Sequence, residues 1–387
     1  MRGKRLFILG AGASIAHTKG LFPSITDFFT KANELEIFSK EKHEFKELAN
    51  YIQEFFGQNI FKKRIKINIE TIFTHLEIQL ERSSGGNLIG IREQLLNLIR
   101  LVLIELASKV QDEDGEYKKF AKQLRETDTI ITFNWDLLLD DILNRKDMLK
   151  NKNFSKEYRP QQYRNFLRDL SAFSESTTWR NIFAKPPYEK WESEEGLYLK
   201  LHGSVDWVYC PNEYCRGFGK VFPVLKPTKK YYCSNCHEEM VTLLIPPVLN
   251  KQYRKYPLIR RLWNTAAQEM HSVAELIIWG YSLPATDFYN EWLLREARKS
   301  KNIKKLILIN PNNIRKGKQG NYISRTFVIR FYNLFRDIIP KELIELYEYF
   351  EDYLAKNDLF SKYNLEFRQE RRSVKKALSS KKKRIGS

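Results

Sequence analysis

The sequence predicts an α/β fold with a Rossmann-like parallel sheet, a helical insertion and a small zinc-ribbon module. Three observations predict it. Short apolar runs end in polar or glycine-bearing loops, a long stretch with helical spacing separates the first two runs, and four cysteines form two close pairs. Short apolar runs are typical of parallel strands buried on both faces, whose functional residues follow their carboxyl ends.

Five of these runs are expected to be strands. They are residues 6–9, 129–133, 197–201, 275–279 and 305–309. The first runs directly into Gly10, as in the first unit of a Rossmann sheet. Because the carboxyl ends of parallel strands meet at one edge of a sheet, the residues that follow these runs are expected to lie close together.

The region between the first two strands is expected to be helical. Residues 45–56 place apolar side chains at the 3.6-residue spacing, and residues 68–80 and 91–107 follow the same pattern on either side of a Ser/Gly turn at 83–87. We expect residues 30–125 to form a helical subdomain inserted into an α/β domain of residues 1–29 and 126–323.

The C-terminal part returns to helical spacing. Residues 324–363 follow it, and Pro340 is expected to open the second of two helices within a C-terminal helical segment of residues 324–367. Residues 144–191 are polar, aromatic and proline-containing, and predict no defined element.

Composition is that of a water-soluble globular protein, with 42% hydrophobic and 29% charged residues. The most apolar stretch, residues 95–107, carries Asn97, Arg100 and Glu105 and is too short to span a bilayer. Only four apolar residues precede Gly10 near the N-terminus, which argues against a signal peptide. We therefore expect a cytoplasmic protein with no membrane contact.

The net charge of +19 is concentrated at one end. Residues 368–387 hold nine basic residues and one acidic residue, so this tail contributes +8. Such a tail is typical of a disordered, solvated segment, and equally of an electrostatic contact to DNA or an acidic partner. Composition leaves both interpretations open.

The four cysteines predict a structural zinc site. Cys210 and Cys215 form one pair, Cys233 and Cys236 form the other, and 17 residues separate the pairs. Two pairs, each on its own turn, are what tetrahedral zinc–thiolate ligation requires, so residues 208–240 are expected to form a zinc ribbon. The alternative is two disulfides, which a cytoplasmic location disfavours.

The loop after the first expected strand contains Gly10, Ala11 and Gly12. Glycines at this place let the backbone approach the pyrophosphate of a dinucleotide. A third glycine is missing, and Ser14 and Ala16 occupy that part of the turn. Taken alone, the loop fits an ordinary tight turn equally well.

Together with three other segments, this loop resembles the sirtuin family. The segments are residues 10–14, 132–136, 201–204 and 280–283, and their order matches that family, which also carries a zinc ribbon between the third and fourth. The resemblance implies that His202 is the catalytic base and that Asn134 and Asp136 face the nicotinamide ribose and carboxamide of NAD+. It also implies that Gly280 and Ser282 contact the phosphate or adenosine side and that Asn310 contacts the adenosine ribose. The residues that it implies line the dinucleotide are Gly10, Ala11, Gly12, Ser14 and Thr132.

The chemistry of three of these residues fits cleavage of the nicotinamide–ribose bond. That reaction needs an oriented water and a proton acceptor more than a strong nucleophile, because the leaving group is cationic. Asn134 can orient a water or a ribose hydroxyl, His202 can accept a proton near neutral pH, and Asp136 can accept hydrogen bonds from a carboxamide. The structural alternatives are a strand-end cap for Asn134, a helix cap for Asp136 and a packing role for His202.

Two segments depart from the protein-deacylating members of the family. Residues 22–28 lack the arginine of their Ile-Pro-Asp-Phe-Arg segment, and Pro246 and Pro247 lie in place of the segment that pairs with a peptide. Proline removes backbone donors and so hinders the addition of a substrate strand. The departures resemble the sirtuin-like NADases of bacterial antiphage defence, some of which pair with a ring-forming ATPase of HerA type.

This second resemblance implies a regulated, oligomeric NAD+ glycohydrolase that releases nicotinamide and ADP-ribose and depletes cellular NAD+. Two alternatives stay open. One is an NAD-dependent protein deacylase. The other is a nucleotide-sensing or nucleic-acid-associated subunit with little turnover, whose basic tail contacts DNA or a partner.

Overall fold

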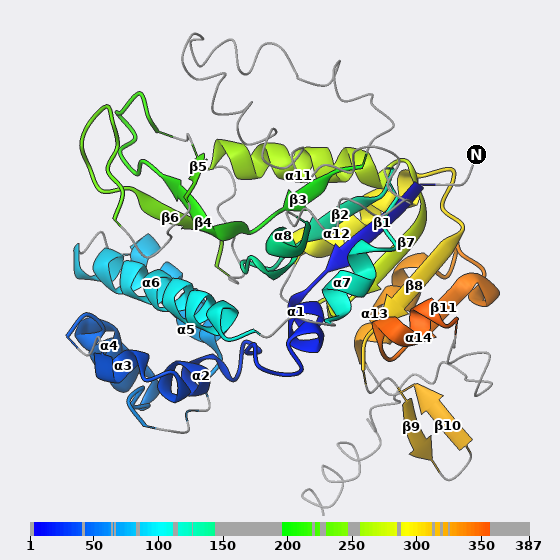
Figure 1. The fold of residues 1–387 in the computed structure, drawn as a ribbon, viewed down its shortest axis with the longest axis horizontal. Coiled ribbons are helices and arrows are strands. Elements are labelled where there is room, and N and C mark those ends of the chain that lie inside the picture. The colour runs from blue at the N-terminus through cyan, green and yellow to red at the C-terminus, as the bar shows by residue number, and fades with distance from the viewer. Residues whose placement is uncertain are drawn as a thin grey trace, which may run out of the picture.

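A six-stranded parallel sheet forms the centre of the computed structural model (Figure 1). The structure describes residues 4–40, 43–62, 65, 67–82, 86–110, 115–125, 127–143, 196–218, 221–224, 230–246, 256–284, 288–311, 314–317, 320–323 and 326–356. In spatial order the strands are β11 (Ile344–Tyr347), β8 (Lys305–Ile309), β7 (Val273–Trp279), β1 (Lys4–Leu9), β2 (Thr129–Thr132) and β3 (Tyr198–Lys200). All five expected strands are present and every neighbouring pair is parallel, which confirms the predicted sheet.

The strand order reverses between β1 and β7. From β1 the chain continues to β2 and β3 on one side, and the later strands β7, β8 and β11 lie on the other side. In open α/β sheets, ligands bind outside the carboxyl ends of the strands at such a reversal. The loops that follow β1 and β7 therefore occupy the position where this fold class places a ligand.

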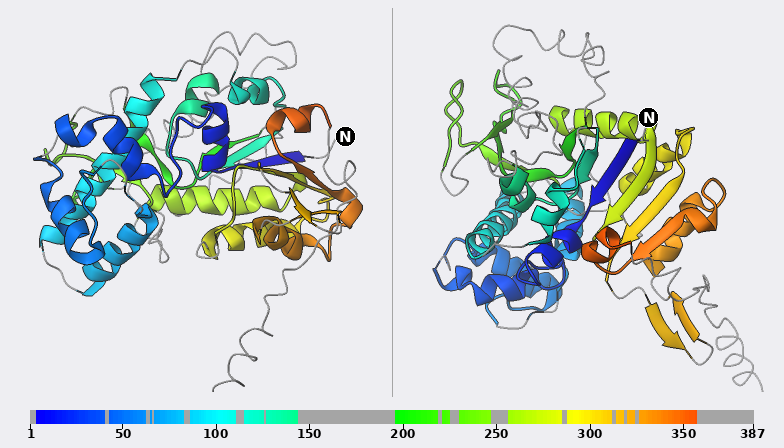
Figure 2. Two further views of the ribbon diagram at one scale, coloured as in Figure 1. Left: turned by 90° about the horizontal axis from the view of Figure 1, so that it is seen from below. Right: turned by 45° about the vertical axis from the view of Figure 1, so that its right-hand side comes forward.

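Helices cover both faces of the sheet (Figure 2). Side chains alternate along a strand, so Leu6 and Ile8 belong to one core and Phe7 and Leu9 to the other. The first core also contains residues of α11 (Pro257–Met270), α12 (Phe288–Glu296), the 3₁₀ helix η4 (Ala297–Lys299) and α13 (Thr326–Phe335). The second contains residues of α1 (Ala11–His17), α7 (Glu116–Ala121), α8 (Leu138–Leu143) and α14 (Phe350–Leu354).

Five further helices lie between β1 and β2 in the chain and extend the second core. They are α2 (Phe28–Glu34), α3 (Ile37–Lys40), α4 (Lys46–Phe56), α5 (Ile69–Arg82) and α6 (Gly86–Ser108). The helices expected at residues 45–56, 68–80 and 91–107 are thereby confirmed. Within residues 30–125, α7 contacts α1, α8 and α14 and so packs on the sheet. The division into an inserted subdomain and an α/β domain stays a prediction.

Two smaller sheets complete the described structure. Strands β5 (Val221–Pro223), β4 (Gly203–Tyr209) and β6 (Val241–Leu244) form an antiparallel sheet, against which α6 packs. Strands β9 (Ile314–Gly317) and β10 (Gly320–Ile323) form a hairpin beyond the edge of the main sheet (Figure 1).

The expectation of a second helix opened by Pro340 is wrong. Pro340 precedes a short 3₁₀ helix, η5 (Lys341–Leu343), and the chain then forms β11 at the edge of the sheet. Ile344 and Leu346 are buried there, and β11 pairs in parallel with β8. A four-residue strand depends on this tertiary pairing, which the local spacing of apolar residues does not reveal.

Several sequence-based expectations fall on residues outside the described ones: the segment at 144–191, most of the turn at 83–87, Pro247, the end of the C-terminal helical segment beyond residue 356, and the basic tail at 368–387. Among the described helices, none combines the length and the apolar character needed to cross a membrane.

Gly280, in the loop after β7, lies against Gly12 and Ala13 after β1, and this close packing predicts a difference between two glycine substitutions. Gly280 and Gly57 have nearly equal positive φ angles of 65° and 63°, so alanine strains both by about 1 kcal/mol. A Cβ on Gly280 would lie 2.1 Å from the backbone nitrogen of Ala13, whereas one on Gly57 would meet nothing within 4 Å. We expect Gly57→Ala to lower the free energy of unfolding by about 1 kcal/mol, and Gly280→Ala by roughly 2 kcal/mol more. Urea denaturation measures both, and equal losses would contradict the close contact.

Candidate functional site

The loops after β1 and β7 are joined by backbone hydrogen bonds. The Gly10 N–H donates to the Trp279 carbonyl at 3.0 Å, and the Gly12 N–H donates to the Gly280 carbonyl at 2.9 Å. A Cβ on Gly10 or Gly12 would lie 2.6 or 2.8 Å from the Gly280 oxygen. The packing of one loop on the other therefore requires these glycines, whatever ligand they meet.

A buried hydrogen-bond network lies directly behind the glycine loop. Ser14 Oγ donates to Asp136 Oδ2 at 2.8 Å and lies 2.9 Å from the Tyr117 hydroxyl. Asn134 Nδ2 donates to the Gly10 carbonyl at 3.0 Å and to Ser14 Oγ at 2.9 Å. Both amide hydrogens of Asn134 are thus used, and its Oδ1 is left to accept from a bound water or hydroxyl.

Asp136 makes the helix-start contact that was its structural alternative, and its role toward a carboxamide stays a prediction. Its Oδ1 accepts from the Leu138 N–H at 3.1 Å, at the start of α8, while its Oδ2 accepts from Ser14. The side chain is buried, with 8% of its surface exposed. Burial raises the pKa of Asp136, and the Lys200 charge and the hydrogen bond from Ser14 partly offset that rise. Asp136 acts as a helix cap and also anchors the network at Ser14.

His202 lies in the turn between β3 and β4. Its ring centroid is 5.0 Å from that of Phe133 and 6.2 Å from that of Trp263, and only 6% of its surface is exposed. The Trp263 indole donates to the Leu201 carbonyl at 3.2 Å, and the Ile245 N–H donates to the His202 carbonyl at 2.9 Å. Bonds from α11 and from the end of β6 thus hold this turn.

The remaining predicted site residues follow the neighbouring strands. Thr132 Oγ1 accepts from the Asn134 N–H at 3.1 Å. The Gly280 N–H donates to the Ile309 carbonyl at 3.0 Å, which places Asn310 beside the loop after β7. Ser282 is exposed in that loop, and Ala11 is exposed at the start of α1. All predicted residues lie at one sheet edge, and their roles toward a ligand stay predictions.

Two residues of this region carried no functional prediction. Tyr117 is fully buried in α7, and its only local signal is one aromatic residue among the apolar positions of a helix. Lys200 is also fully buried; its Nζ donates to the Asp136 carbonyl at 2.6 Å and to Asp140 Oδ2 at 3.0 Å. A lysine inside an apolar strand, two residues before His202, is a sequence signal that could have identified it.

The four cysteines form one cluster at the outer end of the β5-β4-β6 sheet. Their sulfur atoms lie within 4.8 Å of one another, with Cys210 and Cys236 at 3.5 Å and Cys215 and Cys233 at 3.6 Å. All four thiols are free. Zinc–sulfur bonds of about 2.3 Å in a tetrahedron place sulfur atoms roughly 3.8 Å apart, so the donor set fits structural zinc and the disulfide alternative is wrong.

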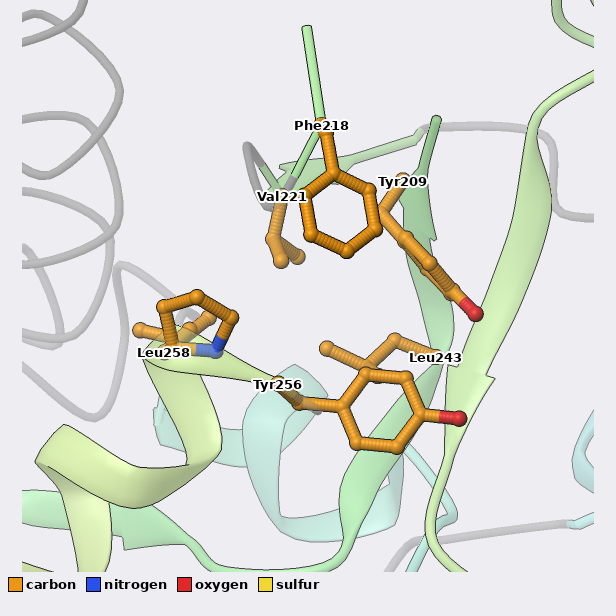
Figure 3. Close-up of a pocket in the computed structure, with 7 residues that line it drawn as sticks. Tyr209, Phe218, Val221, Leu243, Tyr256 and Leu258 are labelled. Carbon is orange, nitrogen blue, oxygen red and sulfur yellow. The ribbon is translucent and has the colours of Figure 1, made fainter. Parts of the chain in front are cut away.

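A small apolar pocket lies between the β5-β4-β6 sheet (the ribbon sheet) and the start of α11 (Figure 3). Across it, the side chains of Phe218 and Val221 face those of Leu243, Tyr256 and Leu258. None of its lining residues belongs to the cysteine cluster or to the loops after β1 and β7. We assign this pocket to the packing of the ribbon on α11.

The cysteine cluster predicts that the purified protein holds one zinc ion per chain. A Cys236→Ser variant should lose most of this zinc, because one of four thiolates is removed. Its thermal midpoint should fall, and a chelator should lower the wild-type midpoint toward the same value. Elemental analysis and thermal denaturation measure both effects. Full stability in a metal-free wild-type protein would contradict a structural role for the metal.

The pKa of Asp206, in β4, predicts a pH-dependent stability. Its Oδ1 is buried without a hydrogen-bond partner among the described residues, and burial raises its pKa to about 6. In the unfolded chain an aspartate titrates near pH 4. Above pH 6 the folded state therefore holds an unfavourable charge, and this cost disappears as the pH falls from about 6 to 4. We expect Asp206→Asn to be more stable than wild type by up to about 3 kcal/mol at pH 7.5, with the gap closing near pH 4.

Asp337 is the matched control for this experiment. It pairs with Arg298, and the hydrogen bond lowers its pKa to about 2. Asp337→Asn should therefore be less stable than wild type at neutral pH, and that gap should close only below about pH 4. Urea denaturation between pH 3 and 8 separates the two signs. A pH-independent gap for Asp206→Asn would show that Asp206 is not buried as a charge.

No protein-family profile and no curated protein sequence matches the chain. Among solved structures, it is similar to a Sir2 homologue in complex with NAD, at 13% identity over 80% of this chain and 78% of that chain, with a TM-score of 0.38.

Two further similarities are of the same kind. One is to a mutant Sir2 homologue with 2′-O-acetyl ADP-ribose, at 13% identity over 80% of this chain and 82% of that chain, with a TM-score of 0.35. The other is to Sir2Tm bound to a propionylated peptide, at 13% identity over 93% of both chains, with a TM-score of 0.31. At these low values the fold assignment rests on the strand order and registers of the chain itself.

Proposed function

We propose that this protein is a sirtuin-like NAD+ glycohydrolase that cleaves the nicotinamide–ribose bond with water. The observation that carries the proposal is the network of Ser14, Asn134 and Asp136 beside the strand-order reversal, with His202 on the neighbouring strand end. These are the residues that the sirtuin resemblance assigns to NAD+. The network fixes the amide of Asn134 with Oδ1 as its acceptor, which suits the binding of a water or a ribose hydroxyl.

The chemistry then needs no covalent intermediate on the protein. Water oxygen bonds to C1′ of the ribose, the bond from C1′ to the nicotinamide nitrogen breaks, and nicotinamide leaves with that electron pair. Asn134 orients the water and His202 accepts its proton. One NAD+ and one water give nicotinamide, ADP-ribose and one proton.

The end of β6 favours hydrolysis over deacylation. A peptide substrate that adds as a strand needs free backbone donors on the protein. The Ile245 N–H already donates to the His202 carbonyl, and Pro246 has no N–H. These two consecutive positions therefore offer no donor to a peptide, and water remains the acceptor of the ribosyl group.

Burial of the site supports an enzyme that requires activation. The exposed surface of Ser14 is 2% and that of His202 is 6%, whereas Ala11 and Ser282 of the same site are exposed, so we propose that activation opens the path to the two buried side chains. The resemblance to antiphage NADases suggests how this is controlled: a cytoplasmic effector in a homo-oligomer, with a HerA-type ATPase partner or a DNA contact through the tail as its trigger. We include these features in the proposal on that resemblance.

The proposal predicts nicotinamide release that depends on two side chains. Incubation with NAD+, with and without candidate activators, should yield nicotinamide and ADP-ribose in equal amounts. His202→Ala and Asn134→Ala should each lower kcat by at least about 10²-fold, because proton acceptance or water orientation is lost. His271→Ala is the control: it removes a half-exposed histidine paired with Glu296 at 2.8 Å and should leave the rate unchanged. Quantitative chromatography of the products measures each rate.

Two outcomes would favour the alternatives. Nicotinamide that appears only when an acyl-lysine peptide is added would indicate a deacylase. Tight NAD+ binding without turnover under every condition, together with salt-sensitive DNA binding that is lost on deletion of residues 368–387, would indicate a sensing subunit.

A further inference from the structure

Lys200 is a buried cation that the proposed chemistry does not use. None of its surface is exposed, although lysine is almost never fully buried unless it is paired. Removing an ammonium group from water is costly, and a buried ion pair seldom repays that cost. Besides its partner Asp140, the Lys200 charge acts on the buried carboxyl groups of Asp136 and Asp206, whose pKa values it lowers. The burial of Lys200 at the carboxyl end of β3 therefore calls for an explanation beyond stability.

The contacts of Lys200 connect it to both halves of the candidate site. Its Nζ donates to the backbone carbonyl of Asp136 at 2.6 Å and to Asp140 Oδ2 at 3.0 Å. The Tyr198 hydroxyl donates to the same Asp140 oxygen at 3.1 Å. In the chain, Lys200 comes two residues before His202, so one strand end carries both the cation and the candidate base.

We propose that Lys200 is a positioning residue that fixes the Asn134–Asp136 segment relative to the His202 turn. The inference rests on the proposed function of this site. The segment from residue 133 to 137 has no regular secondary structure, and two neighbouring strands hold its backbone. The Val205 N–H of β4 donates to the Trp135 carbonyl at 3.0 Å, and the Lys200 side chain of β3 donates to the next carbonyl, that of Asp136. Asn134 and Asp136 adjoin these bonds on one side, and β4 and β3 anchor them on the other.

The chain offers a matched control in a second buried ion pair of the same sheet. Arg5 Nε donates to Asp128 Oδ1 at 2.9 Å, and 6% and 0% of the two residues are exposed. This pair joins the start of β1 to the residue before β2, at the amino ends of the strands, whereas the candidate site lies at their carboxyl ends. Breaking either pair leaves a buried carboxylate, so both substitutions should destabilise the protein, whereas only Lys200 lies next to the site.

The first experiment needs no ligand. Hydrogen exchange of the full-length protein, followed by mass spectrometry, compares wild type with Lys200→Met, Lys200→Arg and Arg5→Met. We expect amides of residues 134–138 to exchange at least about tenfold faster in Lys200→Met, with partial recovery in Lys200→Arg. Arg5→Met should instead speed exchange near residues 4–9 and 125–130. The same pattern in Lys200→Met and Arg5→Met would overturn the proposal.

The double variant Lys200→Met/Asp140→Asn keeps the proposal testable if Lys200→Met fails to fold, because it removes the unpaired carboxylate as well. It should still show fast exchange at residues 134–138. Slow, wild-type exchange there would show that the loop holds its place without Lys200, and would overturn the proposal.

The second experiment measures nicotinamide release per folded molecule. Lys200→Met should lower kcat by on the order of 10²-fold with a smaller change in KM, since a displaced Asn134 misorients the water. The ionised Asp136 accepts the hydrogen bond of Ser14, so protonation of Asp136 should lower the rate. The Lys200 charge lowers the pKa of Asp136, against the effect of Asp140, and it also lowers that of Asp206, so removal of Lys200 should move the acidic limb of the rate profile to higher pH. Arg5→Met should change neither. An equal loss of kcat in Lys200→Met and Arg5→Met would contradict a positioning role for Lys200. A wild-type protein without turnover would refute the proposed function instead, and the hydrogen-exchange result would then test Lys200 on its own.

Discussion

The close approach of the loops after β1 and β7 is the constraint on which the rest of the site depends. The Gly12 N–H reaches the Gly280 carbonyl at 2.9 Å only because neither residue carries a Cβ between the two backbones. This contact closes the sheet edge at the strand-order reversal and fixes the start of α1. Ser14, one turn into that helix, is thereby placed against Asn134 and Asp136.

Behind this contact, Ser14, Tyr117, Asn134 and Asp136 form a network in which each side-chain donor has a defined acceptor. Ser14 has one hydrogen, which it gives to Asp136, so the nearby Tyr117 hydroxyl and Asn134 amide must donate to Ser14. The Gly10 carbonyl sets the same orientation of the Asn134 amide independently. In a low-dielectric interior, such a network holds one arrangement, because each alternative leaves a buried group without a partner.

The zinc ribbon and the His202 turn are parts of one structural unit. The turn passes directly into β4, the central strand of the ribbon sheet, and β6 returns beside it so that the Ile245 N–H meets the His202 carbonyl. Cys210, at the far end of β4, joins the cluster that closes this small sheet. A zinc ion held by the four cysteines would act on the site from a distance, by holding together β4 and β6, whose near ends contact the His202 turn.

Elements that depend on short-range pattern could be predicted from the sequence. The apolar runs at residues 6–9, 129–133, 197–201 and 275–279 predicted strands, because strands buried on both faces are apolar throughout. The two cysteine pairs predicted a metal site, because thiolate ligation requires closely spaced cysteines. Pattern could not locate β11, whose four residues become a strand only through pairing with β8.

The pairing of buried polar groups, in contrast, could be read only from the fold. Nothing near Tyr117 in the chain indicates that its hydroxyl reaches Ser14, more than a hundred residues away, and nothing near Asp140 indicates an ion pair with Lys200. From the sequence, Asp136 could either accept from the carboxamide of NAD+ or cap a helix. In the structure its two carboxylate oxygens accept from the Leu138 N–H and from Ser14 Oγ. Short-range pattern specifies which segments become strands and helices, whereas the partner of a buried polar group is set by the packing of segments that are distant in the chain.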